Sequence, residues 1–268
     1  MTSLFYIQLI TSFFVGGIVI ALLSFFAERA NKKIAGIVLS LPSTVVIGYF
    51  FIGWATSAEA IFDIAPTTIA TDGSVLFFAI VYIYLSKIKT NKITSILIST
   101  TLSLLTWFIL SIPLAIIKFD NLLLSLVLYL IPVMVSYYFL SYKNKVEKNS
   151  EKLTYSNFQK IARAIFAGLI ISLSVYLSKM IHPFWGGIFS GFPAAFLSTF
   201  IILHWYYGSQ MLFKIAKTIP AGSIVFIIYI LAARYTFSSF GIIGGTILAY
   251  LISLISFFIL IKIQNRKK

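Results

Sequence analysis

The sequence predicts an all-α fold: a polytopic membrane protein of about nine transmembrane helices, arranged as two inverted four-helix repeats joined by a linker helix. Of the 268 residues, 60% are hydrophobic and 10% are charged. Apolar runs of about 20 residues, the length that crosses roughly 30 Å of hydrocarbon, recur from end to end. They lack the strict alternation of barrel strands. We therefore expect membrane-spanning helices rather than a soluble core.

The apolar runs place the spans, and charged or turn-forming residues separate them. The nine predicted spans are Leu4 to Phe26, Ile34 to Thr56, Pro66 to Leu85, Ile93 to Ile117, Leu122 to Leu140, Ile161 to Ile181, Phe184 to Trp205, Thr218 to Tyr235 and Gly241 to Ile261.

Positive residues gather on one side of the predicted membrane. The connections on that side hold 18 Lys and Arg residues, whereas the other side holds only Lys118, Lys179 and Arg234. Because basic connections stay in the cytoplasm, we expect an outside N-terminus and a cytoplasmic C-terminus, in a prokaryotic plasma membrane. The polar stretch 143–160 is expected to be a solvated connector, and the alternative is that it binds anionic lipid headgroups.

Several function classes are disfavoured by composition. The net charge of +14 is spread over the connections, with no long basic tract interleaved with aromatic residues, so nucleic acid is not an expected partner. There is no cysteine, which excludes disulfides, thiol nucleophiles and cysteine metal sites. The first apolar run lacks a basic n-region and is read as a retained span, not a cleaved signal peptide.

A shift of 151 residues aligns the two halves of the chain. The pairs at this offset include Gly17 with Gly168, Gly36 with Gly187, Pro42 with Pro193, and Trp54 with Trp205. Glycine, proline and tryptophan residues held at one offset, with the span boundaries in step, indicate duplication of a four-span unit.

The second unit is predicted to be inverted. Five crossings separate the two starts, and the second-to-third connection carries the acidic residues Glu59 and Asp63, whereas its counterpart carries Lys214 and Lys217. Inverted repeats of this kind are common among secondary transporters. The predicted organisation is a first repeat at 1–117, a linker span with a basic connector at 118–160, and a second repeat with a basic tail at 161–268.

The predicted binding site lies at two prolines that interrupt the second and seventh spans near the middle of the bilayer. A proline inside a helix frees the carbonyl four residues back, here that of Val38 and that of Phe189, and bends the helix. The alternative is that these are kinks and small-residue packing seams. The substrate-binding candidates are Ser40, Pro42, Ser43, Thr44, Gly187, Ser190, Gly191 and Pro193.

Ionisable residues inside the spans are few. Asp72 and Arg234 are predicted to lie in the outer third of the bilayer, about 22 Å from the basic end of their helices. They are candidates for an ion pair, or for coupling to a proton or cation. The alternative is that both extend to the outer interface. His182 and His204 are expected at opposite interfaces beside tryptophans.

No catalytic constellation can be assembled from these residues, so we expect neither an enzyme nor a bound cofactor. No spacing typical of a metal site, a phosphate-binding loop or a nucleophile with its base occurs.

The segments around the two prolines carry a resemblance. Lys33 to Pro42 and Phe184 to Pro193 each place small residues before a proline and a long apolar run. This pattern resembles the small four-span GlpM-like membrane proteins, and implies one such unit in each half without assigning a substrate. The four-plus-one-plus-four plan is also similar in architecture to the drug/metabolite transporter superfamily, which does not by itself establish function.

The sequence therefore favours a secondary transporter or exporter of a small organic solute, working by alternating access between the second and seventh spans. The expected partners are the lipid bilayer, the solute and a coupling proton or cation, and a homodimer is compatible with the sequence. One alternative is a membrane assembly factor or complex subunit that transports nothing. A third option is a flippase for lipids or lipid-linked molecules.

Overall fold

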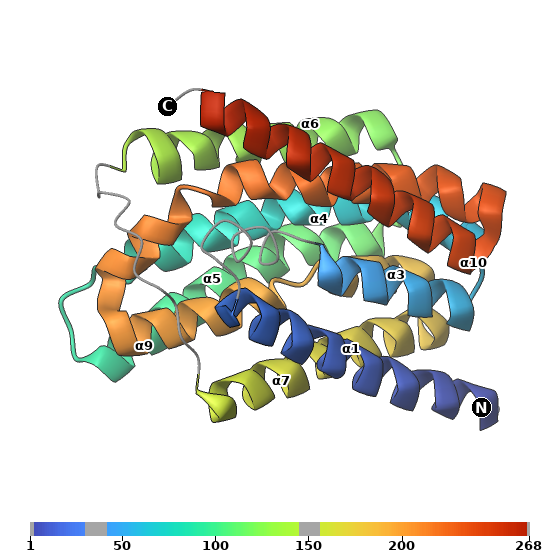
Figure 1. Ribbon diagram of the computed structural model, residues 1–268, viewed down its shortest axis with the longest axis horizontal. Helices are drawn as coiled ribbons and strands as arrows, with labels where there is room; N and C mark the ends of the chain where they lie inside the picture. The colour runs from blue at the N-terminus through green and yellow to red at the C-terminus, as the bar shows by residue number, and fades with distance from the viewer. Residues whose placement is uncertain (1–2, 30–41, 145–155, 267–268) are drawn as a thin grey trace.

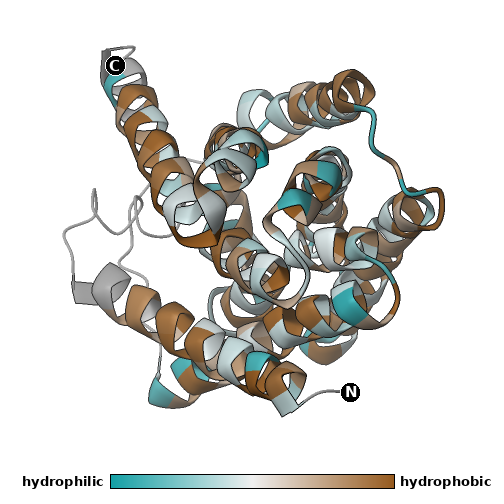
Figure 2. Ribbon diagram, turned by 90° about the vertical axis from the view of Figure 1, so that its right-hand side faces the viewer, coloured by the Kyte–Doolittle hydropathy of each residue, from teal (hydrophilic) through white to brown (hydrophobic). Residues whose placement is uncertain are grey.

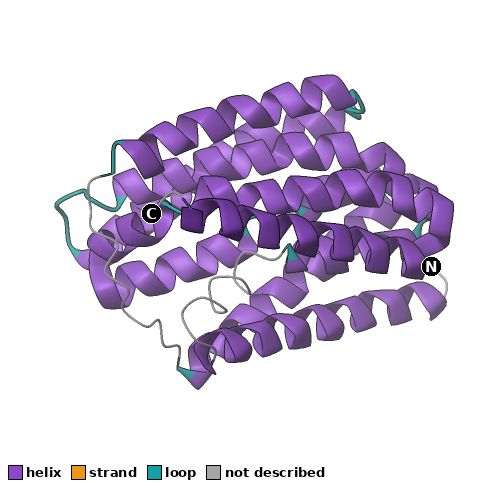
Figure 3. Cartoon of the chain, turned by 45° about the horizontal axis from the view of Figure 1, so that its top comes forward, coloured by secondary structure: helices purple, strands orange, loops and turns teal. Residues whose placement is uncertain are grey.

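The computed structural model describes residues 3–29, 42–144 and 156–266, and no strand occurs among them. The helices follow one another with short loops, as Figures 1 and 3 show. They are α1 (Ser3–Arg29), α3 (Ser43–Ala55), α4 (Ala58–Leu85), α5 (Lys92–Ile116), α6 (Leu122–Ser136), the π-helical η1 (Tyr137–Tyr142), α7 (Asn157–Met180), α8 (Pro183–Ser190), α9 (Ala194–Ala216) and α10 (Ile219–Arg266).

Seven helical segments are long and apolar enough to cross a membrane, which fits a multi-pass integral membrane protein. They are Ser3–Leu23, Ala58–Leu85, Lys92–Ile116, Leu122–Tyr142, Asn157–Met180, Pro183–Ala216 and Ile219–Leu260. The described part of the predicted second span is a shorter apolar helix, α3, and its first residues lie outside the described ranges.

Helix α4 begins earlier than the sequence predicted. The predicted third span starts at Pro66, but the helix starts at Ala58, where the Ser57 side chain accepts the Ala60 N–H (3.2 Å). Pro66 lies inside α4 and is buried. A proline within a helix removes one backbone hydrogen bond. Here the cap at Ser57 and the packing along the helix outweigh that loss, so the prediction was wrong by eight residues.

Two glycines turn the chain sharply inside helices that are otherwise continuous. Gly208 in α9 (φ 72°) and Gly241 in α10 (φ 67°) have left-handed backbone conformations that glycine adopts without steric penalty. Figure 1 shows the second arm of α10, in red, folding back along the first. The predicted eighth and ninth spans are thus joined by a single-glycine turn.

Helix α4 lies at the centre of the bundle. It packs against α3, α5, α6, α8, α9 and the first part of α10. Its buried side chains include an unusual run of polar groups, namely Thr67, Thr68, Thr71, Asp72 and Ser74. The outer helices instead expose large apolar side chains, such as Ile109 (70% exposed) and Leu123 (78% exposed), and Figure 2 shows their hydrophobic character. An apolar exterior around a partly polar centre fits a bundle surrounded by lipid.

The two ends of the bundle differ in charge. Figure 1 places the α4–α5 connection, the start of α7 and the C-terminus at one end, and the N-terminus and the turn inside α10 at the other. At the first end lie the basic residues Lys87, Lys89, Lys92, Lys143, Lys160, Arg163, Lys214, Lys217 and Lys262. The opposite end has Lys118, Lys179 and Arg234. The division of charge along the sequence is therefore also a division in space.

Candidate functional site

The predicted seventh span is broken rather than kinked. Helix α8 ends at Ser190, three residues follow without helical structure, and α9 begins at Ala194. The Phe189 carbonyl, which the sequence predicted to be freed by Pro193, accepts the Phe192 N–H (3.1 Å). That expectation was wrong because the helix stops before the proline and the chain closes a tight turn there.

Helix α3 begins in the same way as α9. Pro42 and Pro193 are the N-cap residues of the two helices, with nearly equal dihedrals (φ −76°, ψ 44° and φ −73°, ψ 42°), and neither helix has a side-chain cap. Both helices start in the middle of the bundle and run toward opposite ends (Figure 1). Ser40 and Val38, which precede Pro42, lie outside the described residues.

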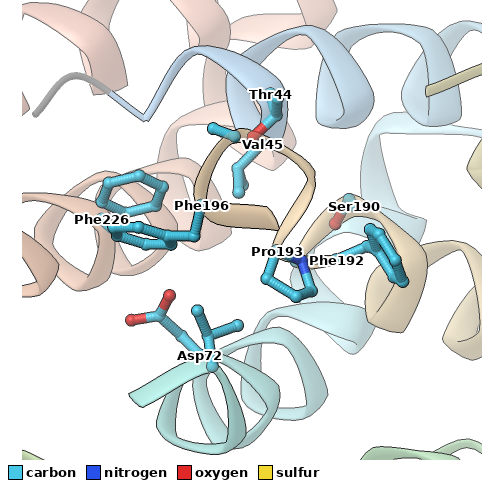
Figure 4. Close-up of a pocket in the computed structure, with 11 residues that line it drawn as sticks. Thr44, Val45, Asp72, Ser190, Phe192, Pro193, Phe196 and Phe226 are labelled. Atoms are coloured by element: carbon cyan, nitrogen blue, oxygen red, sulfur yellow. The ribbon is translucent and has the colours of Figure 1, made fainter. Parts of the chain in front are cut away.

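A cavity lies where these two helices begin. Its lining residues are Thr44, Val45, Asp72, Val75, Ser190, Gly191, Phe192, Pro193, Ala195, Phe196 and Phe226. Figure 4 shows how α3, α4, the α8–α9 break and α10 converge on it. Its volume is about 30 Å³, more than the ~10–15 Å³ that one buried water needs but far below the ~300–1,000 Å³ of a typical small-molecule pocket.

The wall of the cavity is built from residues of both halves of the chain at the same offset. The pairs Thr44 and Ala195, Val45 and Phe196, and Val75 and Phe226 are each 151 residues apart. This is the offset predicted from the sequence to relate the two halves. Residues separated by that offset therefore line the same cavity.

Asp72 supplies the acidic group of the cavity. It lies 14 residues after the first residue of α4 and 13 before the last. It is thus near the middle of α4, whereas its predicted place in the outer third was measured from the basic end of the helix alone. Its side chain is 8% exposed, and its Oδ2 atom has no hydrogen-bond partner among the described residues. Figure 4 shows the carboxylate reaching from α4 toward the start of α9.

Arg234 belongs to a different environment. Its guanidinium carbon lies 3.8 Å from the centroid of the Phe62 ring, and Phe62 precedes Asp72 by ten residues on α4, about 15 Å along the helix axis. Its Nε and Nη1 atoms find no hydrogen-bond acceptor in the described chain. Arg234 therefore stacks on an aromatic ring near one end of α4. It is too far from Asp72 for the two predicted coupling residues to form an ion pair.

The other predicted binding residues divide into cavity and packing positions. Thr44, Ser190, Gly191 and Pro193 line the cavity, whereas Pro42, Ser43 and Gly187 do not. A side chain at Gly187 would place its Cβ 3.0 Å from the Cβ of Ile64, so this glycine permits close packing of α8 on α4. Its carbonyl accepts hydrogen bonds from Thr68 (3.2 Å) and Ser190 (2.8 Å).

The apolar wall of the cavity was not among the predicted binding residues; it is formed by Val45, Val75, Phe192, Phe196 and Phe226. Phenylalanine and valine are abundant throughout the chain, so residue type singles out none of them. The repeat offset is a usable signal, because it maps Val75 onto Phe226 and Val45 onto Phe196. It becomes informative only once one member of each pair is known to face the cavity.

The two histidines lie apart from the cavity. Burial, and to a lesser degree Lys118, lower the pKa of His182 in the α7–α8 connection, although Asp63 acts in the opposite direction. His204 on α9 is buried, and its Nε2 atom lies 3.4 Å from the Ser95 hydroxyl in the first turn of α5. No group of three or more His, Asp or Glu side chains that could hold a metal ion occurs in the described residues.

The fold and the cavity define an all-helical protein that fits a membrane bundle with a small polar centre between two helix starts. A family described as "Protein of unknown function (DUF3147)" matches residues 160–265, a stretch that begins in the first turn of α7 and ends in the last turn of α10. Comparison with curated proteins and with solved structures gives no match.

Proposed function

We propose that this protein is a secondary transporter of a small solute, with its binding site in the cavity between the start of α3 and the α8–α9 break. The observation that carries the proposal is the construction of that cavity. Two helices, α3 and α9, begin there at a proline, and three pairs of residues at the 151-residue offset line it. Transporters with inverted repeats place their substrate sites at such repeat interfaces, on discontinuous helices.

The course of the helices supports an inverted repeat. In Figure 1, α1 runs from the N-terminal end of the bundle while its counterpart α7 runs toward that end, and α3 and α9 are opposed in the same way. The turns are also in step, because Gly208 and Gly241 correspond at this offset to Ser57 and Thr90, which lie in the α3–α4 and α4–α5 connections. The family match at 160–265 covers nearly the whole of the proposed second unit.

The two units would move against each other around the cavity. With the site at their interface, rocking of one unit would open it to each side in turn. With a volume of about 30 Å³, the cavity admits only a solute of a few non-hydrogen atoms. The sequence has no phosphate-binding glycine loop for a nucleotide, so an ion gradient, the gradient of the solute or a partner protein would drive the cycle. Nine crossings, with a cytoplasmic C-terminus, are part of this proposal.

Cysteine accessibility tests the proposal, because the chain has no native cysteine. The variants Thr44→Cys and Ala195→Cys place a thiol at equivalent positions of the cavity. We expect a membrane-impermeant thiol reagent to label each of them from either side of sealed vesicles. Ile109→Cys, on an exposed apolar face of α5, is the control that should resist this reagent.

Protection of both cavity cysteines from both sides would contradict alternating access and favour a membrane subunit or assembly factor. Labelling by a lipid-soluble reagent alone would also contradict it, and would favour a groove open to lipid, as a flippase requires.

A further inference from the structure

We propose that the cavity binds a small monovalent anion together with one proton, the anion on the first turns of α3 and α9 and the proton on Asp72. This inference rests on the proposed transport site and specifies its substrate class and coupling ion.

Backbone N–H groups at the starts of α3 and α9 lie beside the cavity. The first N–H groups of a helix have no carbonyl partner within it. The first main-chain bonds within the helices are Val46 N–H to the Pro42 carbonyl (2.9 Å) and Leu197 N–H to the Pro193 carbonyl (2.8 Å). The Ala194 N–H donates to the Phe192 carbonyl (2.7 Å), so in α9 it is the N–H groups of Ala195 and Phe196 that have no carbonyl partner within the helix. Neither N-cap provides a side-chain acceptor. Thr44, Val45, Ala195 and Phe196 line the cavity from these two first turns, so two sets of N–H donors begin beside it.

A second and independent observation points to a ligand. The Asp72 carboxyl group lines the same cavity, is more than nine-tenths buried and has an oxygen without a hydrogen-bond partner in the described residues. Leaving a charged or polar group unsatisfied inside a protein is costly. Inside a membrane bundle, an isolated carboxyl group typically marks a proton or ion pathway.

The charge balance of the cavity determines which ligands it can bind. A helix N-terminus acts as about half a positive charge, so two of them roughly balance one ionised Asp72. An anion added to the ionised site would leave a net negative charge among the apolar side chains Val75, Phe192 and Phe226, which is strongly unfavourable. One proton on Asp72 restores the balance, and the protonated acid gains an O–H donor that can face the anion. Binding of the anion and binding of the proton are therefore linked.

The other ionisable groups around α4 leave Asp72 as the proton site. Tyr129 on α6, whose hydroxyl contacts Ser223 of α10 (2.9 Å), is close enough to sense the Asp72 charge. Tyr49 on α3 and Tyr229 on α10 have ring centroids 6.1 Å apart. Tyr49 is also within electrostatic range of Arg234. Toward the basic end lie Tyr82 and His204, whose rings pack together, Lys92 near His204, and Tyr84 with Lys87 over its ring. Toward the other end, Tyr235 packs on Phe62. The α8 segment contributes no ionisable side chain.

Calorimetry on the purified full-length protein in lipid nanodiscs tests the inference without requiring transport. The probes are chloride, formate and acetate as sodium salts, with gluconate holding sodium constant. Titrations in two buffers of different ionisation enthalpy give the number of protons taken up. We expect about one proton per anion, and an affinity that falls by up to about tenfold per pH unit as Asp72 loses its proton.

Three variants sharpen the result. Asp72→Asn imitates the neutral acid, so we expect it to bind the anion without proton uptake and without pH dependence. Asp63→Asn, which changes an exposed acid on the same helix, should behave as the unmodified protein. Ala195→Leu keeps Asp72 and fills the cavity, and should weaken anion binding at least tenfold even if the Asp72 variant does not fold.

Absence of anion binding, or binding without proton uptake, would overturn the inference. So would binding of sodium, or of the zwitterion glycine, that Asp72→Asn abolishes. These results are separable from the cysteine experiment: labelling from both sides with no anion binding would leave the transporter standing and remove only its assigned substrate.

Discussion

At the scale of single residues, two charged side chains on helices predicted to cross the membrane have quite different surroundings. Asp72 is buried in the cavity with an unpartnered oxygen, whereas Arg234 stacks its guanidinium on Phe62 and is only partly buried. A cation over an aromatic face contributes about 0.5–2 kcal/mol, more as water is excluded. Arg234 therefore has a stabilising role that does not involve Asp72.

A double-mutant cycle distinguishes this arrangement from an ion pair. We expect Arg234→Gln to lower the free energy of unfolding by about 0.5–2 kcal/mol. Its effect should add to that of Asp72→Asn within about 0.5 kcal/mol, because the two groups are well separated. Unfolding in mixed micelles, followed by circular dichroism, measures both terms. Phe62→Leu should remove much of the Arg234 effect. A coupling above about 1 kcal/mol between Asp72 and Arg234 would instead mean that they interact directly.

At the scale of helices, close approach depends on glycines that face a neighbouring backbone. A Cβ added at Gly73 would lie 2.5 Å from the Leu128 carbonyl oxygen and 3.2 Å from Pro132 Cγ. Backbone atoms cannot move aside as a flexible side chain can. The packing of α6 on α4, next to the residue that carries the cavity's carboxyl group, therefore requires a residue without a side chain at this position.

Gly73→Ala tests this packing. We expect it to lower the free energy of unfolding by about 1–3 kcal/mol, the usual effect of overpacking a core, and to lower the midpoint of thermal unfolding accordingly. Gly53→Ala is the matched control, because its added Cβ would lie no closer than 3.4 Å to a side-chain atom of Ile242. Equal stability of the two variants would show that α4 and α6 can separate at little cost.

Some helix boundaries could be predicted from the sequence and others could not. Long apolar runs predicted α5 and α6 to within one residue of their starts, because lipid exposure demands continuous apolarity. The start of α4 was predicted too late. Pro66 was the predicted beginning of the helix, whereas the true beginning is marked in the sequence by only one capping residue, Ser57. The helix break at Pro193 was located from symmetry. Its tight turn and the aromatic wall depend on tertiary packing that residue type does not reveal.

At the scale of the whole molecule, the proposed repeat and the uneven placement of its one buried acid bear on the same cavity. Residues 151 positions apart line the cavity, but Asp72 corresponds at this offset to Ser223, so one half alone supplies the carboxyl group. Under the proposed transport cycle, a site with one acidic group would open to both sides while carrying one titratable charge. The orientation of the bundle would then decide which compartment delivers that proton first.

The orientation can be measured at the two ends of the bundle. Lys89 lies in the connection between α4 and α5, at the basic end, and Asp120 lies between α5 and α6, at the opposite end. Because basic connections are retained in the cytoplasm, we expect Asp120→Cys to react with an impermeant thiol reagent on intact cells. Lys89→Cys should react only after the cells are made permeable. The reverse pattern would mean that the bundle is inserted the other way round, and reaction of both on intact cells would mean that α5 does not cross the membrane. With the predicted pattern, the N-terminal end faces outward, and an inward proton gradient would load Asp72 from the side with fewer basic residues, where the field of the protein repels protons least.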